Sequence, residues 1–454
     1  MSSAPLTIVV GAGISGLTCA YALKKSGQNV LLLEAGARPG GVIESVAENG
    51  FLFELGPQSF SGTGPLFQLC EELGIADQLV EAPHRAPRYI WLNSKFVPVP
   101  FSPGAFLSSS LLSWRTKFSI LTEVLRTSPP PDADESVATF VRAKFTQELL
   151  DRLVGPFISG IYAGDPEELS LRAAFPKIYE ADKLSGSVVR GSIRLGKNKT
   201  ATQSARRPGL YSFQKGNATL THALADSLGP EIRYNSEIDE EIARDGDHFV
   251  LKIVGVGGER EIRADKLVLA TPASVNADLL RLIAPAATFP SFDIEYAPVA
   301  VVSHGFHKSQ VGADLRGFGF LIPRTENIRT LGCVWNSSLF PGRAPADHVL
   351  ITSFIGGVRK PKIHRFSEQE SVELVRREVG KILRISAEPV VERVTDYSSA
   401  IPQYNVGHLQ RLQAIRDSVG KVPGLWFTGN YWNGPAIGAC VEHALSVAEA
   451  VRIG

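Results

Sequence analysis

The chain has 454 residues, of which 44% are hydrophobic and 20% are charged, so it can bury a large core and is longer than one ordinary domain. The 47 basic and 46 acidic residues nearly cancel, which excludes the strongly basic character that nucleic-acid binding requires. No apolar run reaches the roughly 18 residues of a membrane-spanning helix, and the cysteines form no C-x-x-C pair, so we expect a cytoplasmic protein without a metal site or a disulfide framework.

The first predicted element is a strand over residues 6–10, which is β-branched or apolar throughout, as in a parallel sheet that is covered on both faces. A G-x-G-x-x-G motif follows it, with glycines at Gly11, Gly13 and Gly16. We expect the three glycines to provide a tight turn, a close approach of backbone to a pyrophosphate, and close packing of a helix on the strand.

A helix is predicted from Ser15 to Lys25, with its N-terminal N–H groups facing the phosphates. A second strand over residues 29–34 ends on Glu34, whose carboxylate can accept hydrogen bonds from ribose hydroxyls. This unit predicts a dinucleotide site, and a glycine-rich turn in an ordinary α/β unit is the alternative. NAD and FAD both use the unit, so the choice between them depends on the residues after Glu34.

A second glycine pair comes after the second strand. The string Glu34-x(3)-Arg38-x-Gly40-Gly41 resembles the flavoprotein family of amine oxidases, phytoene desaturases and protoporphyrinogen oxidases, which favours FAD over NAD. The broader family has Arg after the glycine pair where this chain has Val42, a position that varies among protoporphyrinogen oxidases.

Residues 91–205 are predicted to be mostly helical. They are interrupted by a proline-rich stretch at residues 127–137, where Asp134 or Ser136 could cap a new helix.

An apolar stretch at residues 96–128 has Trp114, Arg115 and Lys117 at its middle. Apolar groups with an aromatic and basic border are typical of a surface that inserts into one leaflet of a membrane. An ordinary helical core is the alternative, and the family resemblance favours peripheral membrane contact.

The most specific motif lies in the middle of the chain. The run G-I-Y-A-G-D-P-x-x-L-S, Gly160 to Ser170, resembles a hallmark of protoporphyrinogen oxidases that amine oxidases lack. Further matches follow in the family's order, at residues 54–60, 318–323, 401–408 and 439–444. Two departures are Ala439, where the family usually has Asp, and Ala444, where it usually has Gly.

The segment from residue 206 to 290 resembles a return into the cofactor domain. Gly216 precedes a predicted helix, and a strand over residues 231–242 is expected to pass the adenosine end of FAD with Ile238 in contact. A charged hairpin and a buried strand ending in Thr271-Pro272 come next, the latter beside the flavin in relatives.

Residues 291–394 are predicted to form antiparallel strands with polar turns, a sheet that covers the active site. At the C-terminus we predict a strand, a Gly429-Asn430 turn, and a helix that begins at about Ala436. In this fold the helix N-terminus lies near the flavin ring, where its partial positive charge stabilises the anionic reduced flavin.

The resemblance implies an α/β fold with a Rossmann-like FAD-binding domain of the p-hydroxybenzoate hydroxylase and amine oxidase type. That domain is assembled from residues 1–90, 206–290 and 395–454. A helical, membrane-contacting domain (91–205) and an antiparallel-sheet substrate domain (291–394) are inserted between these segments.

The same resemblance implies FAD held without a covalent bond. The residues expected to contact it are Gly11, Gly13, Ile14, Ser15, Gly16, Glu34, Ala35, Arg38, Gly40, Gly41, Gly56, Pro57, Ile238, Thr271, Gly429 and Ile437.

The implied reaction is the oxidation of protoporphyrinogen IX to protoporphyrin IX by three hydride transfers to FAD, with O2 reduced to H2O2 each time. For the substrate, the resemblance assigns Arg88 to a propionate, Leu321 and Phe354 to a hydrophobic clamp, and the Gly160 backbone to the ring. No Ser-His-Asp arrangement, HExxH motif or carboxylate pair is recognisable in the sequence. We therefore assign no catalytic acid or base, and the absence of these motifs counts against a hydrolase.

Three alternatives stay open. The first is the oxidation of coproporphyrinogen III, which has four propionates instead of two, and a more basic rim of the pocket would favour it. The second is an amine oxidase, which should show an aromatic pair facing the flavin, for which Tyr431 and Trp432 are candidates. The third is a non-catalytic escort protein of the same fold, although such proteins have degraded FAD motifs.

The other expected partners are a membrane surface, a ferrochelatase and a second copy of the chain. Nucleic acid is not an expected partner.

Overall fold

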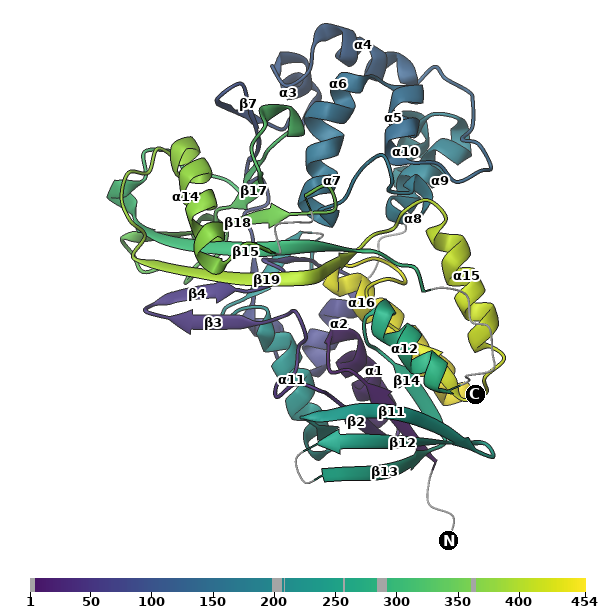
Figure 1. Cartoon of the computed structure of the whole chain (residues 1–454). Coiled ribbons are helices and arrows are strands. Elements are labelled where there is room, and N and C mark those ends of the chain that lie inside the picture. Colours follow the sequence, from purple (N-terminus) through teal and green to yellow (C-terminus); the bar gives the residue numbers. More distant parts are fainter. Residues whose placement is uncertain (1–4, 198–205, 208, 256–257, 284–291, 361–364) are drawn as a thin grey trace.

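The computed structural model describes residues 5–197, 206–207, 209–255, 258–283, 292–360 and 365–454 (Figure 1). In it, a five-stranded sheet with parallel pairings joins distant segments of the chain. The strand order is β10 (Ile232–Arg233), β2 (Asn29–Leu33), β1 (Leu6–Val10), β14 (Lys266–Leu269) and β20 (Leu425–Phe427). The strands predicted from the two ends of the sequence are therefore confirmed as neighbours in one sheet.

Both faces of this sheet are buried, which explains why its strands are apolar throughout. Val9 and Leu32 belong to the core on one face, whereas Ile8 and Leu31 belong to the core on the other. The first face is covered by α1 (Ile14–Lys25), α2 (Gly64–Glu72), α11 (Ala218–Leu228) and α16 (Ile437–Ile453). The second is covered by α12 (Ala273–Ile283), α15 (His408–Val419) and the antiparallel strands β11 (Ser236–Asp245), β12 (His248–Gly255) and β13 (Gly258–Ala264).

A seven-stranded sheet lies between this domain and the helical region in Figure 1. Its order is β19 (Val391–Pro402), β15 (Tyr296–His307), β18 (His348–Gly356), β17 (Thr330–Val334), β16 (Gly319–Leu321), β7 (Arg88–Leu92) and β8 (Lys95–Pro98). Helix α14 (Glu368–Leu383) packs on one face of this sheet, where it shares a hydrophobic core with Ala300, Phe320 and Trp335.

The predicted boundaries at residues 90 and 394 cut through strands of this sheet. Strand β7 pairs with β16 and β8 pairs with β7, so residues 88–98 belong to the sheet although they precede it by about 200 residues in the sequence. The β16–β7 pairing is also parallel, whereas we predicted only antiparallel strands. Periodicity in the sequence shows that a strand exists, but not which distant strand it pairs with.

Residues beyond β8 form the helical region. Its elements are α3 (Pro103–Ser108), α4 (Trp114–Glu123), α5 (Val137–Lys144), α6 (Gln147–Leu149), the π-helical turn η2 (Leu150–Val154), α7 (Gly155–Tyr162), α8 (Leu171–Ala174), α9 (Pro176–Ser185) and α10 (Val188–Lys197). Ser136 caps α5, accepting a hydrogen bond from the Thr139 N–H at 3.1 Å. Asp134 is not the cap, because its carboxylate accepts from Ser170 Oγ at 2.6 Å and from the Gly407 N–H at 2.9 Å.

Helices α3 and α4 expose large apolar side chains along the stretch predicted to contact a membrane. Trp114 is 69% exposed and Arg115 is also exposed. Lys117, which we expected at the border, is instead buried and donates to the carbonyls of Leu107 and Ser109 at 2.7 Å. None of the helices in the described part of the chain combines the length and the apolar character that crossing a bilayer demands.

The remaining elements connect these units. They are the hairpin β3 (Ser45–Glu48) and β4 (Phe51–Glu54), the sheet β5 (Phe60–Ser61), β9 (Leu210–Phe213) and β6 (Leu79–Glu81), the 3₁₀ turns η1 (Ala76–Gln78), η3 (Gly229–Glu231), η4 (Lys308–Gln310) and η5 (Arg324–Glu326), and the short helix α13 (Asn336–Leu339).

Candidate active site

The turn after β1 has a backbone that depends on glycine. Gly11 has a φ of +99°, in a region that residues with a Cβ rarely adopt. A Cβ on Gly16 would lie 1.9 Å from the carbonyl oxygen of Gly11, so α1 packs directly against the turn. A Cβ on Gly13 would meet no atom within 4 Å. The first and third glycines therefore shape the turn, and space remains beside the second.

The second glycine pair lies against this turn. Gly13 and Gly40 form a parallel bridge, and the Gly40 N–H donates to the Ala12 carbonyl at 2.8 Å. A Cβ on Gly41 would lie 3.4 Å from the Cα of Gly13. Gly13 is also the N-cap of α1, and no side chain caps that end. The N–H groups in the first turn of α1 therefore lie beside glycine backbone, with no side chain in the way. This arrangement fits a pyrophosphate.

Ile14 and Ser15 form the first turn of α1. Ile14 is partly buried against the core, and Ser15 is 5% exposed with its hydroxyl against the Cys440 thiol. Their backbone N–H groups, rather than their side chains, are what α1 offers to a phosphate.

The carboxylate of Glu34 is fixed where β2 ends. Its two oxygens accept backbone N–H groups, from Ala12 at 2.6 Å and from Gly36 at 2.8 Å. Each oxygen keeps a second lone pair, which a ribose hydroxyl can use. Ala35 is exposed beside it, and Ile238 lies partly buried on β11.

Arg38 crosses the second glycine pair. Its guanidinium forms an ion pair with Glu44 at 2.6 Å and donates to the Gly41 carbonyl at 2.9 Å. Arg38 therefore holds the Gly40-Gly41 backbone in place from the solvent side.

Gly56 and Pro57 are positioned by close backbone packing. A Cβ on Gly56 would lie 2.0 Å from the carbonyl oxygen of Val42. The Pro57 carbonyl accepts a hydrogen bond at 2.7 Å from the side-chain amide of Asn217, which is the N-cap of α11.

A buried ion pair supports the same segment and was not predicted. Glu54 and Arg343 are 2% and 1% exposed, and their charged atoms are 3.3 Å apart. Glu54 also accepts from Ser45 Oγ at 2.6 Å and the Asn217 N–H at 2.9 Å. Burial raises the pKa of Glu54 to about 7, and the Arg343 charge opposes this rise. The pair connects the loop before β18, in the seven-stranded sheet, to the cofactor domain.

Thr271 and the candidate aromatic pair belong to one polar cluster. The Thr271 hydroxyl is hydrogen-bonded to Asn276, whose amide also contacts the Tyr431 hydroxyl at 2.7 Å. Tyr431 is fully buried, and Trp432 is 6% exposed and stacked on His443. Both rings are packed into the core that covers the second face of the parallel sheet.

Tyr404 joins the seven-stranded sheet to the turn before α16. Its hydroxyl donates to the Asn430 carbonyl at 2.7 Å and accepts the Gly434 N–H at 2.6 Å. Gly429 has a φ of +155° and packs against Tyr431. Ile437, the first residue of α16, is buried, and no side chain caps the helix. As for α1, the N–H groups at the start of α16 have no side-chain cap and can face a ligand.

These features fit FAD. Two helix N-termini without side-chain caps, a turn of glycines that leaves space at Gly13, and a fixed carboxylate at Glu34 meet around one edge of the parallel sheet. Carboxyl ends of parallel strands are where such sheets bind nucleotides.

The residues predicted to bind substrate come together on one face of the seven-stranded sheet. Ile90, Leu321, Gly332, Phe354 and Val301 are successive cross-strand neighbours. Side chains that are paired across strands point to the same face. Gly332, which has no side chain, stands between the half-buried Leu321 and the half-buried Phe354, and Cδ2 of Leu321 reaches over it, 2.9 Å from where a Cβ would lie. We call this missing side chain in the row the Leu321–Phe354 gap.

Gly160 allows α7 to lie against this face. A Cβ on Gly160 would be 2.6 Å from Cδ2 of Leu321, and a Cβ on Gly332 would be 2.9 Å from the same atom. Helix α7 ends at Tyr162, and its C-cap, Ala163, has the left-handed conformation. The glycine at position 160 is therefore needed for close packing, and it is exposed beside Leu321.

Arg88 lies on the same face, one step along the strands. It pairs with Gly319 on β16, two residues before Leu321. Its exposed guanidinium lies 5.2 Å from the Phe318 ring centre and 5.5 Å from that of Phe101. A cation therefore lies at one end of the Leu321–Phe354 gap, where a carboxylate of a bound ring would be accepted.

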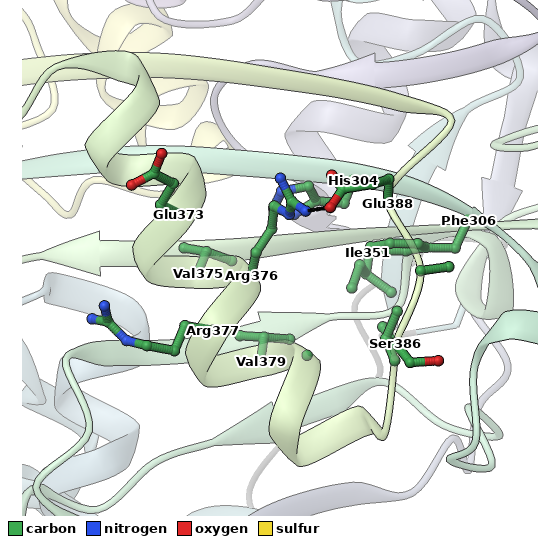
Figure 2. Close-up of a pocket in the computed structure, with 13 residues that line it drawn as sticks. His304, Phe306, Ile351, Glu373, Val375, Arg376, Arg377, Val379, Ser386 and Glu388 are labelled. Atoms are coloured by element: carbon green, nitrogen blue, oxygen red, sulfur yellow. Dashed lines mark ion pairs between the residues drawn. The ribbon is translucent and has the colours of Figure 1, made fainter.

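The hollow drawn in Figure 2 is on the opposite face, between α14 and strands β15 and β18. It has a volume of about 370 Å³ and contains none of the predicted site residues. Its buried His304 has a pKa lowered to about 4 by burial and by Arg376, and Arg376 pairs with Glu388.

Several residues of the site were missed in the sequence. Glu54 and Tyr404 lie in segments that match the family, but no pattern distinguished them from their neighbours. Arg343 follows a Pro-Gly dipeptide, and nothing in its local sequence marks it as a buried charge. Each gains its role from a partner more than 25 residues away, which no local pattern reveals.

Comparisons with known proteins relate the chain to flavoproteins. The family model for flavin containing amine oxidoreductases matches residues 14–452. The chloroplastic protoporphyrinogen oxidase of Oryza sativa subsp. japonica is 36% identical over 98% of this chain and 87% of that protein. The coproporphyrinogen III oxidase of Staphylococcus aureus is 29% identical over 98% of each chain. A crystal structure from Exiguobacterium sp. 255-15 superposes with a TM-score of 0.84 at 25% identity and covers 100% of both chains.

Proposed function

The chain belongs to the family of flavin containing amine oxidoreductases, and from this premise we propose that it oxidises protoporphyrinogen IX to protoporphyrin IX. The oxidation removes six electrons and six protons in three two-electron steps, and each step reduces one O2 to H2O2. When bound, FAD supplies the hydride acceptor for these steps.

The observation that carries the proposal is the row of residues on the seven-stranded sheet. Leu321 and Phe354 flank Gly332 on one face of the sheet, and together they offer apolar surface that suits a flat ring. Arg88, one step along the strands, is placed to hold a propionate. These residues orient the substrate and exclude water, and the chain is assigned no acid or base.

The test is an aerobic assay with purified protein. We expect a yellow protein with a flavin absorbance band that converts protoporphyrinogen IX to the fluorescent porphyrin and forms three H2O2 per porphyrin. A colourless protein that cannot be reconstituted with FAD would support the escort alternative. A yellow protein that is inactive on porphyrinogens but oxidises amines would refute the proposal.

Coproporphyrinogen III is the second candidate substrate. The observation that favours it is a pair of arginines, Arg324 and Arg359, which follow the ends of β16 and β18 on the side of the row opposite Arg88. A parallel assay with both porphyrinogens decides between the two substrates.

We also propose that helices α3 and α4 contact a membrane surface. The proposal is supported by the exposed apolar side chains that they and their flanks carry, namely Phe101, Leu107, Trp114, Phe118, Leu121 and Leu125. Such a group rarely stays exposed in a soluble protein without a partner.

A vesicle flotation assay tests this contact. We expect the protein to float with phosphatidylglycerol-containing vesicles, and the double variant Trp114→Ser, Phe118→Ser to float much less. Equal flotation of the two proteins would contradict membrane contact through α4. The ferrochelatase partner and the homodimer stay predictions.

A further inference from the structure

A cluster of charges lies where three substrate-facing segments end. The Asp165 carboxylate accepts hydrogen bonds from two guanidinium groups, those of Arg324 and Arg359. Arg324 also donates to the Gly164 carbonyl at 2.7 Å. The cluster thereby joins the C-terminal end of α7 to the ends of β16 and β18.

Each member of the cluster follows a predicted substrate residue. Asp165 comes five residues after Gly160, Arg324 three after Leu321, and Arg359 five after Phe354. At about 3.3 Å per extended residue, Arg324 lies on the order of 10 Å beyond the Leu321–Phe354 gap.

Arg88 lies on the other side of the gap. The chain passes along β16 from Gly319, the partner of Arg88, to Leu321, where the strand ends, and then reaches Arg324 at the start of η5. The gap therefore has cationic groups at both of its ends along the strand direction.

The cluster has more positive than negative charge. One carboxylate, 13% exposed, is shared by two guanidinium groups that are 33% and 44% exposed. The nearby Glu167 is already paired with Arg142, and Glu378 accepts from the N–H groups of Arg329 and Thr330.

The pKa shifts agree with this excess. Burial and the neighbouring Arg359 lower the pKa of Arg324, and Asp165 and Glu167 oppose this change without cancelling it. Burial also lowers the pKa of Lys360, with Glu378 opposing and Arg329 and Arg324 adding to the change. Crowded cations with one shared counterion are able to accept a further anion.

We propose that Arg324 and Arg359 form a second carboxylate-binding position for the substrate, at the end of the gap opposite Arg88. The inference rests on the proposed porphyrinogen site. Protoporphyrinogen IX has two propionates, which Arg88 and the solvent accommodate at one end. Coproporphyrinogen III has four, so its additional propionates are the groups that the second position binds. The pair thus raises affinity for the tetracarboxylate selectively.

The test compares two porphyrins that differ in propionate number. Binding of coproporphyrin III and of protoporphyrin IX to the FAD-loaded protein is measured by fluorescence titration. We expect Arg359→Ala to weaken coproporphyrin III binding by about tenfold and to change protoporphyrin IX binding less than about twofold. Arg359→Lys should recover part of the loss, because it restores the charge without the guanidinium geometry.

A matched control is Arg281→Ala, which removes another arginine from an exposed ion pair, with Asp278 on α12, and should alter neither affinity. A second variant, Asp165→Asn, removes the competing carboxylate and should strengthen coproporphyrin III binding. Equal losses for both porphyrins in Arg359→Ala, no loss for either, or weaker coproporphyrin III binding in Asp165→Asn would overturn the inference. Because these are binding measurements, they are distinct from a failure of protoporphyrinogen oxidation in the unmodified protein.

Discussion

The cofactor region and the substrate face of this molecule are built in different ways. Around Gly11, Gly13 and Gly40 the site consists of backbone, and side chains are excluded by contacts as short as the 1.9 Å that a Cβ on Gly16 would make. On the seven-stranded sheet the site consists of side chains, Leu321 and Phe354, held apart by cross-strand register. Backbone sites are specified locally and tolerate almost no change, whereas side-chain sites depend on which strands pair and tolerate graded change.

The largest effect is expected from Gly16→Val. Its Cβ would collide with the Gly11 carbonyl, so α1 must move away from the turn. We expect the FAD dissociation constant to rise by about 1,000-fold or more, which corresponds to about 4 kcal/mol. Flavin fluorescence titration of the apoprotein measures it. Gly104→Ala, at a position where a Cβ would meet nothing within 4 Å, is the control, and similar FAD binding by the two variants would disprove the packing argument.

A smaller loss is expected from Arg343→Met, which breaks the ion pair that connects the two regions. Removing one partner of a buried pair leaves an uncompensated charge, and we expect a loss of about 3 kcal/mol in the free energy of unfolding. Because the pKa of Glu54 is already raised to about 7, Glu54 can become neutral, and the loss should be smaller at pH 6 than at pH 8.

Thermal denaturation of both proteins at the two pH values measures this difference. The double variant Arg343→Met, Glu54→Gln should lose less stability at pH 8 than the single variant. An Arg343→Met protein with the same loss at both pH values would show that Glu54 does not titrate there.

His408 allows a test of pH dependence where the two regions meet. It is fully buried, stacks on Tyr404, and has its Nε2 2.9 Å from the Tyr431 carbonyl. Burial lowers its pKa to about 4. The unfolded state therefore binds more protons below pH 6.5, and the stability falls as the pH drops from about 6.5 towards 4.

Between pH 7 and pH 5 this histidine should account for about 2 kcal/mol of lost stability. His408→Gln removes the titration, so urea unfolding should show a smaller difference between these pH values in the variant. His304 and His443, which have similarly lowered pKa values, keep their own contributions in both proteins. The same pH dependence in the variant would exclude His408 as a source.

The smallest effect is expected on the substrate face. Arg88 is exposed, so its pairing with a propionate is partly screened by water. We expect Arg88→Ala to raise KM for protoporphyrinogen IX about tenfold, near 1.4 kcal/mol, with kcat little changed. Arg88→Lys should be intermediate. A fall in kcat at constant KM would assign Arg88 a different role.

The sequence predicted the parallel sheet well. The strands at 6–10 and 29–34, the first helix, and the helix that begins after Ala436 are confirmed, because each is marked by local features such as apolar runs and glycine turns. The predicted boundaries at residues 90 and 394 fall inside β7 and β19, because these strands pair with β16 and β15, which are distant in the sequence. Lys117 was misplaced for a related reason, because its burial depends on carbonyl groups of the preceding loop.

The local sequence of residues was enough to determine the glycine turn and the strand and helix next to it. It therefore also determined the choice of a dinucleotide cofactor. A φ angle and a helix start depend on a few consecutive residues. Only the tertiary structure decided that Leu321, Phe354, Gly160 and Arg88 share one face, and that Glu54 meets Arg343. Contacts of this kind depend on strand register and on burial, which are properties of the whole packed chain.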